Sequence, residues 1–237
     1  METSNPTLKI ARISSFDQLD QLIDLACDTF INDPLFSLIV PGRHEHPESF
    51  RGMWSMHLSK AYGERGTVIL AAYRERGGER TEFLAFAVWR RHGTSDVAQS
   101  WQGDTWNKKF TRLGVMWSMF FKFILRIPAP GVSLDDAIEV VTGLQEAEKL
   151  YPPERWRLCW LAVSPKCQRT GIGRRLVQWG VDRCEEEGVP AVLESSIPGK
   201  PLYEKMGFRE IGQARYDKGR RAQPVMLRPV EETKKTV

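Results

Sequence analysis

The sequence lacks most of the patterns that identify metal centres and common nucleotide-binding folds. Its four cysteines and four histidines show no Cys-x2-Cys pair and no Cys/His spacing typical of a metal site. It has neither the Gly-x4-Gly-Lys-Ser/Thr pattern of a P-loop nor the Gly-x-Gly-x-x-Gly pattern of a dinucleotide fold. We therefore expect no bound metal, and a phosphate-bearing ligand would need another kind of loop.

Charge and hydrophobicity argue against two further classes of protein. The formal net charge of +4 is small and spread along the chain, whereas nucleic-acid-binding proteins concentrate basic residues on one face. The most apolar run, residues 113–125, is interrupted by Lys122 and is shorter than the ~20 residues of a membrane-spanning helix. We interpret this run as a buried or lid helix, with a membrane-surface or partner-binding helix as the alternative. We expect no nucleic-acid partner and no membrane span.

The chain has the composition of an ordinary globular protein. Hydrophobic residues make up 41% of its 237 residues and charged residues 27%, enough for one sizeable core. The start lacks the charged and apolar regions of a signal peptide, so we expect reduced cysteines and a cytoplasmic location. We predict a single domain over residues 1–237, with a flexible tail at 231–237.

Hydrophobic periodicity predicts an α/β fold. Strands are expected at residues 8–13, 67–73, 83–89, 156–163, 191–194, 208–215 and 224–228. Helices are expected at residues 15–30, 47–62, 104–126, 133–150, 171–187 and 201–206. A turn signal at 76–79 indicates a hairpin, and strand–helix–strand over 156–194 implies a right-handed parallel crossover. Residues from about 92 to 151 lack strands and are interpreted as a helical insertion that covers one side of the site.

An anion-binding loop is indicated between residues 161 and 176. An apolar strand leaves through Pro165 into a short polar loop that contains Gly171 and Gly173, and a helix follows at once. Glycine allows unusual turns and the close approach of a ligand, and the free N–H groups of a helix N-terminus favour a phosphate.

Two motifs give this loop a family context. Gln168-Arg169-Thr170-Gly171-Ile172-Gly173 resembles the acetyl-CoA signature of the GCN5-related N-acetyltransferase (GNAT) superfamily, Gln/Arg-x-x-Gly-x-Gly/Ala after a hydrophobic strand. The segment 202–208 is similar to the family's Leu-Tyr-Glu-Lys-x-Gly-Phe run. The resemblance spans roughly residues 8–90 and 155–228, with specific motifs in 158–208. It implies a mixed, mostly antiparallel central sheet, splayed at the cofactor site and flanked by helices.

The resemblance also implies a binding site for acetyl-CoA as co-substrate. Backbone groups of the strand would pair with the pantetheine amides, and the loop amides would hold the pyrophosphate. The cofactor-binding residues carried over in this way are Leu161, Ala162, Val163, Gln168, Arg169, Thr170, Gly171, Ile172, Gly173 and Arg174. Lys166 and Arg175 also flank the loop, where they could offset phosphate charge or form an ordinary solvated face.

Two catalytic residues are expected. Tyr203 matches the position where many family members hold a tyrosine that protonates the departing thiolate, although a packing role would explain it too. The family often carries a carboxylate or imidazole on the strand before the loop, but residues 157–161 have neither. Glu194, at the end of the next strand, is the best remaining carboxylate, either as a base acting through water or as a structural group.

We predict an N-acetyltransferase that transfers acetyl from acetyl-CoA to an amine of a small molecule by direct attack on the thioester. The alternatives are a peptide or protein N-acetyltransferase and a non-catalytic CoA-binding sensor. Trp54, Trp89, Trp101, Trp106 and Trp117 could line an aromatic, apolar acceptor pocket, while core packing explains each of them individually without a ligand. Asp33, Glu45 and Glu48 could attract a cationic amine, the four histidines are interpreted as structural, and monomer and homodimer both remain open.

Overall fold

The computed structural model describes residues 7–76, 79–124 and 129–230 and contains one mixed seven-stranded sheet. The strand order is β1-β2-β3-β4-β5-β7-β6. The strands are β1 (Thr7–Arg12), β2 (Thr67–Arg76), β3 (Glu79–His92), β4 (Arg155–Val163), β5 (Ala191–Glu194), β6 (Arg209–Tyr216) and β7 (Arg221–Arg228). All neighbouring strands are antiparallel except β4 and β5, which are parallel. The predicted α/β class with a mostly antiparallel sheet is confirmed.

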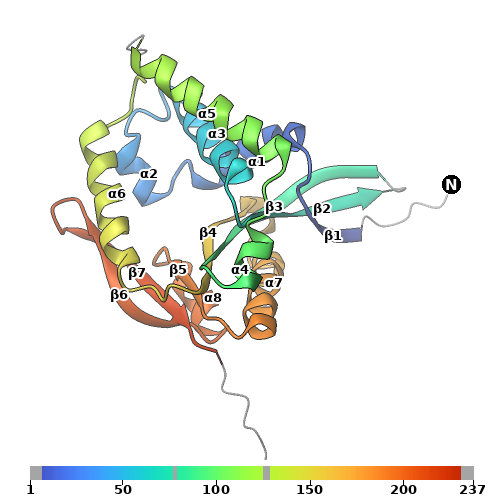
Figure 1. Ribbon diagram of the computed structural model, residues 1–237. Helices are drawn as coiled ribbons and strands as arrows, with labels where there is room; N and C mark the ends of the chain where they lie inside the picture. The colour runs from blue at the N-terminus through green and yellow to red at the C-terminus, as the bar shows by residue number, and fades with distance from the viewer. Residues whose placement is uncertain (1–6, 77–78, 125–128, 231–237) are drawn as a thin grey trace, which may run out of the picture.

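Helices cover both faces of this sheet (Figure 1). The longer ones are α1 (Leu19–Phe30), α3 (Pro47–Gly63), α5 (Trp106–Ile124), α6 (Leu134–Glu148) and α7 (Ile172–Glu187). The shorter ones are η1 (Phe16–Gln18), α2 (Pro34–Ile39), α4 (Asp96–Trp101), η2 (Pro165–Cys167) and α8 (Lys200–Glu204). One apolar cluster joins α1 and α3 to one face of the sheet, and a second joins α7 and α8 to the other face.

Most predicted elements are present, and two α-helices and the short helix η2 are additional. Helix α2 begins at Pro34, where the sequence indicated only a helix break, and the side chain of Asp33 caps it by accepting the amide of Leu35 at 2.8 Å. Helix α4 occupies part of the segment that had been left without an element. The predicted turn at 76–79 and the predicted tail at 231–237 lie partly or wholly outside the described residues.

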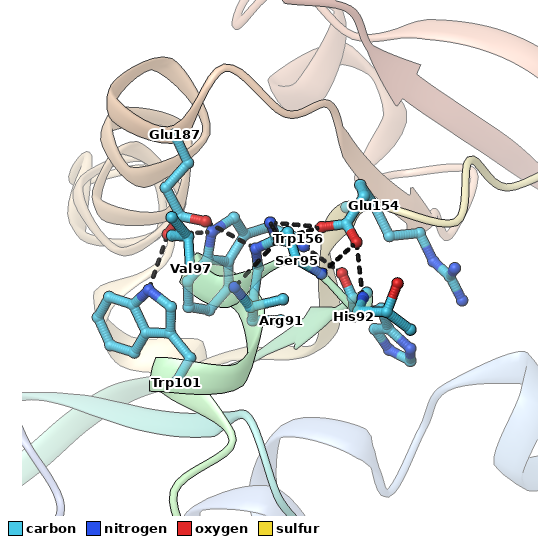
Figure 2. Close-up of polar contacts among 12 residues, drawn as sticks. Arg91, His92, Ser95, Val97, Trp101, Glu154, Trp156 and Glu187 are labelled. Carbon is cyan, nitrogen blue, oxygen red and sulfur yellow. Dashed lines mark hydrogen bonds and ion pairs between the residues drawn. The ribbon is translucent and has the colours of Figure 1, made fainter.

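A buried charge network fixes the beginning of the predicted insertion to the sheet (Figure 2). The guanidinium of Arg91, on β3, forms ion pairs of 2.7 Å with Glu187 and 2.8 Å with Glu154. Glu187 also accepts the indole N–H groups of Trp101, at 2.8 Å, and Trp156, at 3.1 Å. The last turn of α7, strand β4 and helix α4 are thereby held to one arginine, and burial makes such a network sensitive to the loss of any member.

The three helices of the insertion lie in different places (Figure 1). Helix α4 packs near β3, α5 runs along α3, and α6 lies beside β6. Gly143 permits the last of these contacts, since a Cβ there would lie 2.1 Å from the carbonyl oxygen of Arg215. The segment is therefore not one lid, and α6 is its part that approaches the site described next.

Candidate active site

Strands β4 and β5 separate part-way along their length. Their parallel pairing joins residues 156–158 to residues 191–193 and stops there, while β4 continues to Val163 beside β3. A β-bulge places Cys159 as one extra residue between Leu158 and Trp160, the partners of Trp89 and Val88, and such bulges bend a strand locally. The result is the splayed sheet that the family resemblance implied.

The backbone of β4 offers free hydrogen-bonding groups to this gap. The amide of Ser164 donates to Leu84 of β3 at 2.8 Å. Backbone N–H and C=O groups alternate sides along an antiparallel strand. Those of Ala162 therefore also point to β3, where Ala162 pairs with Phe86, whereas those of Leu161 and Val163 point to the gap. The expectation that all three residues present backbone groups is therefore corrected for Ala162, whose side chain is also fully buried.

The loop after β4 exposes a helix N-terminus to the same gap. Gly171 is the N-cap residue of α7 with a φ of 85°, and no side chain caps the helix. Arg169 also has a positive φ, of 62°, and the side-chain amide of Gln168 donates to the carbonyl of Val163 at 3.4 Å. The first N–H groups of α7 are thus left for an external acceptor, in agreement with an anion-binding loop.

Four cations surround this N-terminus. Lys166, Arg169, Arg174 and Arg175 are all exposed, and none of them forms an ion pair with the residues that the structure describes. An added Cβ at Gly171 would meet no protein atom within 4 Å, whereas one at Gly173 would lie 3.2 Å from a methyl group of Val163. The loop is therefore open and positively charged on its outside, while the first turn of α7 is packed closely on β4.

A cavity of about 260 Å³ lies where β4 and β5 part. It is lined by Phe30, Asp33, Leu35, Phe36, Leu144, Arg157, Cys159, Trp160, Leu161, Glu194, Ser196, Tyr203 and Gln223. It brings together the two predicted catalytic residues, Tyr203 and Glu194, with Leu161 of the predicted cofactor-binding strand. The remaining predicted cofactor-binding residues lie on β4 and the adjoining loop, outside this lining.

Tyr203 is suited to hold a proton. It lies on α8, is buried, and meets the ring of Phe208 edge-to-face at 5.8 Å between centroids. Burial raises the pKa of its hydroxyl, because the phenolate would be poorly solvated there. A hydroxyl in this state remains a proton donor throughout the neutral range.

Glu194 is engaged with a cation. Its carboxylate pairs with the guanidinium of Arg157 at 2.6 Å, and both side chains are largely buried. Burial and the negative charge of Glu194 raise the pKa of the nearby Tyr151 hydroxyl. This arrangement favours the structural reading of Glu194, since its charge is already balanced.

Asp33 is the second carboxylate of the cavity, and it has no cationic partner among the described side chains. Burial raises the pKa of Asp33, and the amide of Leu35 opposes that shift only in part. The residue was predicted as an amine-attracting group but could not be placed from the sequence. The sequence feature that marks its position is the Asp33-Pro34 pair, an N-cap residue followed by a proline in the first turn of α2.

The aromatic wall of the cavity is not the one that was expected. Phe30, Phe36 and Trp160 form it. The indole of Trp54 packs behind them, with its centroid 4.8 Å from Phe30 and 4.9 Å from Trp160. None of the five predicted tryptophans lines the cavity: Trp54 and Trp89 are fully buried core residues, and Trp106 and Trp117 lie exposed on α5. Trp160 could not be recognised beforehand because the bulge at Cys159 determines which face it occupies.

The fold is that of an α/β domain, and comparisons with known proteins name its family. A family model described as an acetyltransferase (GNAT) domain matches residues 140–228. An uncharacterized N-acetyltransferase of Schizosaccharomyces pombe is 41% identical over 187 aligned residues, which cover 76% of this chain and 66% of the relative. The chain belongs to the GNAT acetyltransferase superfamily. About a third of the yeast relative lies outside this match.

Solved structures support the fold. The crystal structure of the histone acetyltransferase HPA2 and related acetyltransferase from Corynebacterium glutamicum has a TM-score of 0.56 at 20% identity, covering 95% of this chain and 96% of that one. The crystal structure of mosquito arylalkylamine N-acetyltransferase like 5b has a TM-score of 0.50 at 15% identity, covering 93% of this chain and 99% of that one. At these identities the likeness concerns architecture alone. A search of the described helices finds none with the length and hydrophobicity to cross a membrane.

Proposed function

We propose that this chain transfers the acetyl group of acetyl-CoA to the amine of a small molecule. The observation that carries the proposal is the continuity of three features: the open N-terminus of α7, the free edge of β4, and the cavity that contains Tyr203. Family membership supports the reaction class, and the local geometry supports the co-substrate.

The loop and the strand fit acetyl-CoA. The free N–H groups of residues 171–173 and the cations Lys166, Arg169, Arg174 and Arg175 would hold its phosphates. The gap-facing backbone groups of Leu161 and Val163 would pair with the amides of the pantetheine arm. Acetyl-CoA supplies the acetyl group as a thioester, which an amine can attack directly.

The residues of the cavity divide the remaining tasks. The Tyr203 hydroxyl would give its proton to the leaving sulfur, since burial keeps it protonated. The amide of Val163 would stabilise negative charge on the carbonyl oxygen. Asp33 would bind the ammonium form of the substrate and accept its proton, because a carboxyl group with a raised pKa is a better proton acceptor. Glu194 would position Arg157 and the cavity wall.

The cavity favours a small acceptor with an apolar body. Its volume of about 260 Å³, with Leu35 of α2 and Leu144 of α6 in the wall, favours a small acceptor over several residues of a polypeptide. The rings of Phe30, Phe36 and Trp160 can pack against an aromatic or aliphatic group and attract a cation. We also propose a cytoplasmic location, which the four free cysteines support.

The first experiment is calorimetric titration with acetyl-CoA, CoA and ATP. We expect the wild type to bind acetyl-CoA and CoA but not ATP. Gly171→Asp should weaken acetyl-CoA binding by about 100-fold or more, because its side chain would enter the open space beside the helix N-terminus and repel phosphate.

The matched control is Gly219→Asp. Gly219 has a similar φ of 78° and also has no atom within 4 Å of a Cβ, but it lies in the β6–β7 turn. Both variants carry the same backbone strain and added charge, so only the loop variant should lose binding. Equal affinity of the two folded variants would remove the loop from the cofactor site.

The second experiment follows CoA release with a panel of acceptors, from 2-phenylethylamine to a short peptide with a free N-terminus. We expect the small amine to be preferred. Asp33→Asn keeps the helix cap, because asparagine caps as well as aspartate, and should raise KM for cationic amines about ten-fold.

Each other outcome has a distinct meaning. Preference for the peptide would indicate a peptide N-acetyltransferase, and CoA binding without turnover of any amine would indicate a sensor. An unchanged KM and an unchanged kcat in Asp33→Asn would leave Asp33 as a helix cap alone.

A further inference from the structure

Helix α5 carries an apolar stripe that faces solvent. Trp106, Phe110, Leu113 and Met116 lie on adjoining turns and are between 50% and 72% exposed. Their spacing of four, three and three residues places them on one side of the helix. We call these four residues the α5 stripe. Exposed apolar patches of this kind mark an interaction surface more often than chance.

The opposite side of α5 is held to α3 by polar contacts. The guanidinium of Arg112 donates to the carbonyl of Gly63 at 2.8 Å and pairs with Asp104 at 2.5 Å. The ammonium group of Lys108 donates to the carbonyl of Glu64 at 3.4 Å. Among the described side chains of α5, residues 106–118, the apolar stripe is thus on the exposed side, whereas a helix of a water-soluble domain normally turns its apolar side to the core.

An uncharged groove extends the stripe toward α3. The groove measures about 510 Å³, is lined in part by Phe16, Met56 and Phe110, and has no charged side chain in its lining. Phe110 belongs to both the groove and the α5 stripe. The apolar surface is thus wider than one helix face.

Positive charge borders this apolar surface. The sequence of α5 contains four basic residues and no Asp or Glu. The ammonium group of Lys109 lies 4.8 Å from the ring of Trp106, and Lys60 is exposed near the end of α3. Neither lysine forms an ion pair with the described residues, and the nearby Asp104 is already matched by Arg65 and Arg112. Two copies of this surface would repel each other, whereas an anionic surface would be attracted.

We propose that α5 docks this protein on an anionic lipid bilayer. The α5 stripe enters the boundary between headgroups and acyl chains, and Lys60 and Lys109 meet the lipid phosphates. Tryptophan, phenylalanine and lysine on one helix are the residues that such an interface favours. The helix lies on the membrane and does not cross it, in keeping with the absence of a spanning helix among the described elements. The inference is independent of the acetyl-transfer reaction.

The test is co-flotation of the full chain with vesicles of phosphatidylcholine alone or with about 30% phosphatidylserine. We expect binding to the anionic vesicles, about five-fold weaker binding for Lys109→Gln, and loss of binding at high salt. The triple variant Trp106→Ser, Phe110→Ser, Met116→Ser should lose binding and keep its CoA-release activity.

A matched triple variant provides the control. Leu134, Ile138 and Val141 form a similarly exposed apolar row on the acidic helix α6, and their replacement by serine should leave vesicle binding intact. Two results would overturn the proposal. One is failure of the folded wild type to bind anionic vesicles. The other is a wild-type dimer that the α5 triple variant converts to a monomer without any lipid effect, which would assign the α5 stripe to a second copy of the chain.

Discussion

At the scale of single residues, Tyr203, Glu194 and Asp33 line one cavity but differ in their burial and in their charged partners. Burial raises the pKa of the Tyr203 hydroxyl, so it keeps its proton. Glu194 is paired with Arg157 at 2.6 Å, whereas Asp33 faces backbone amides and has no cationic partner among the described residues. The three oxygen groups therefore suit the different tasks that we propose for them: giving a proton, holding the wall and meeting a cation.

Removing the Tyr203 hydroxyl tests the first task. Tyr203→Phe should lower kcat by about 10- to 1000-fold, because the leaving thiolate loses its proton donor, while acetyl-CoA affinity changes little. Single-turnover CoA release and calorimetry measure the two effects separately. Tyr62→Phe is the control, since the Tyr62 hydroxyl donates to the carbonyl of Ser14, away from the cavity. A wild-type rate in Tyr203→Phe would reduce that residue to packing.

The residues that could be predicted are those whose role depends on neighbours in sequence. The run Gln168 to Gly173 is contiguous, and Tyr203 lies within a seven-residue motif. Asp33 and Trp160 come from segments more than 100 residues apart and meet only in the folded cavity. The partner of Glu194 was missed for the same reason, because Arg157 lies 37 residues earlier along the chain. Their assignment to the site is still a prediction that the experiments above address.

At the scale of elements, the position of α7 decides where the loop points. Gly180 lies against Trp89 of β3 so closely that a Cβ would be 2.2 Å from the indole ring. The indole N–H of Trp89 also donates to the carbonyl of Leu176 at 3.2 Å. This close approach of helix to sheet holds the N-terminus of α7 over the gap between β4 and β5.

Filling this contact should displace the helix. Gly180→Ala is expected to lower the free energy of unfolding by about 1–3 kcal/mol through overpacking, and to weaken acetyl-CoA binding as α7 shifts. Gly52→Ala is the control, because a Cβ at that helical position meets nothing within 4 Å and alanine favours helix. Urea unfolding of the two variants measures the difference. Equal stability would show that the Trp89 ring moves aside without cost.

The long elements followed from hydrophobic periodicity, whereas the short helices α2 and α4 did not. Helix α7 was predicted within one residue of its ends because its buried row and Gly188 are both visible in sequence. Helices α2 and α4 have six residues each, too few for a period to emerge. The bulge at Cys159 depends on the pairing with β3, which no local pattern in β4 records.

At the scale of the whole molecule, two apolar cores share one sheet and serve different parts of the proposed reaction. The core under α7 supports the loop for the co-substrate, and the core under α1 and α3 supports the aromatic wall. The cavity lies where the sheet opens between them. Residues 92–151 return to the sheet at α4 and α6 and are tied by the Arg91 network, so we expect the chain to unfold as a single domain.

The aromatic core should make the stability of the whole chain depend on pH. His57 lies between Trp54 and Trp160, with centroids 6.0 and 5.6 Å away, and burial followed by the charge of Lys60 lowers its pKa to about 4. In the unfolded chain His57 becomes protonated near pH 6.5, whereas in the folded chain it stays neutral until about pH 4. The free energy of unfolding therefore falls as the pH drops from about 6.5 toward 4.

Between pH 7 and 5 this histidine alone should lower the free energy of unfolding by about 2 kcal/mol. His57→Phe should remove the contribution of His57 to this pH dependence. The similar contribution of His92 remains, because burial and nearby arginines lower the pKa of His92 to about 3. Urea unfolding at the two pH values measures the difference, and His44→Gln, at an exposed position, should behave as wild type. If His57→Phe kept the full pH dependence, the proton would enter the folded core, and the cavity wall would be looser than its packing indicates.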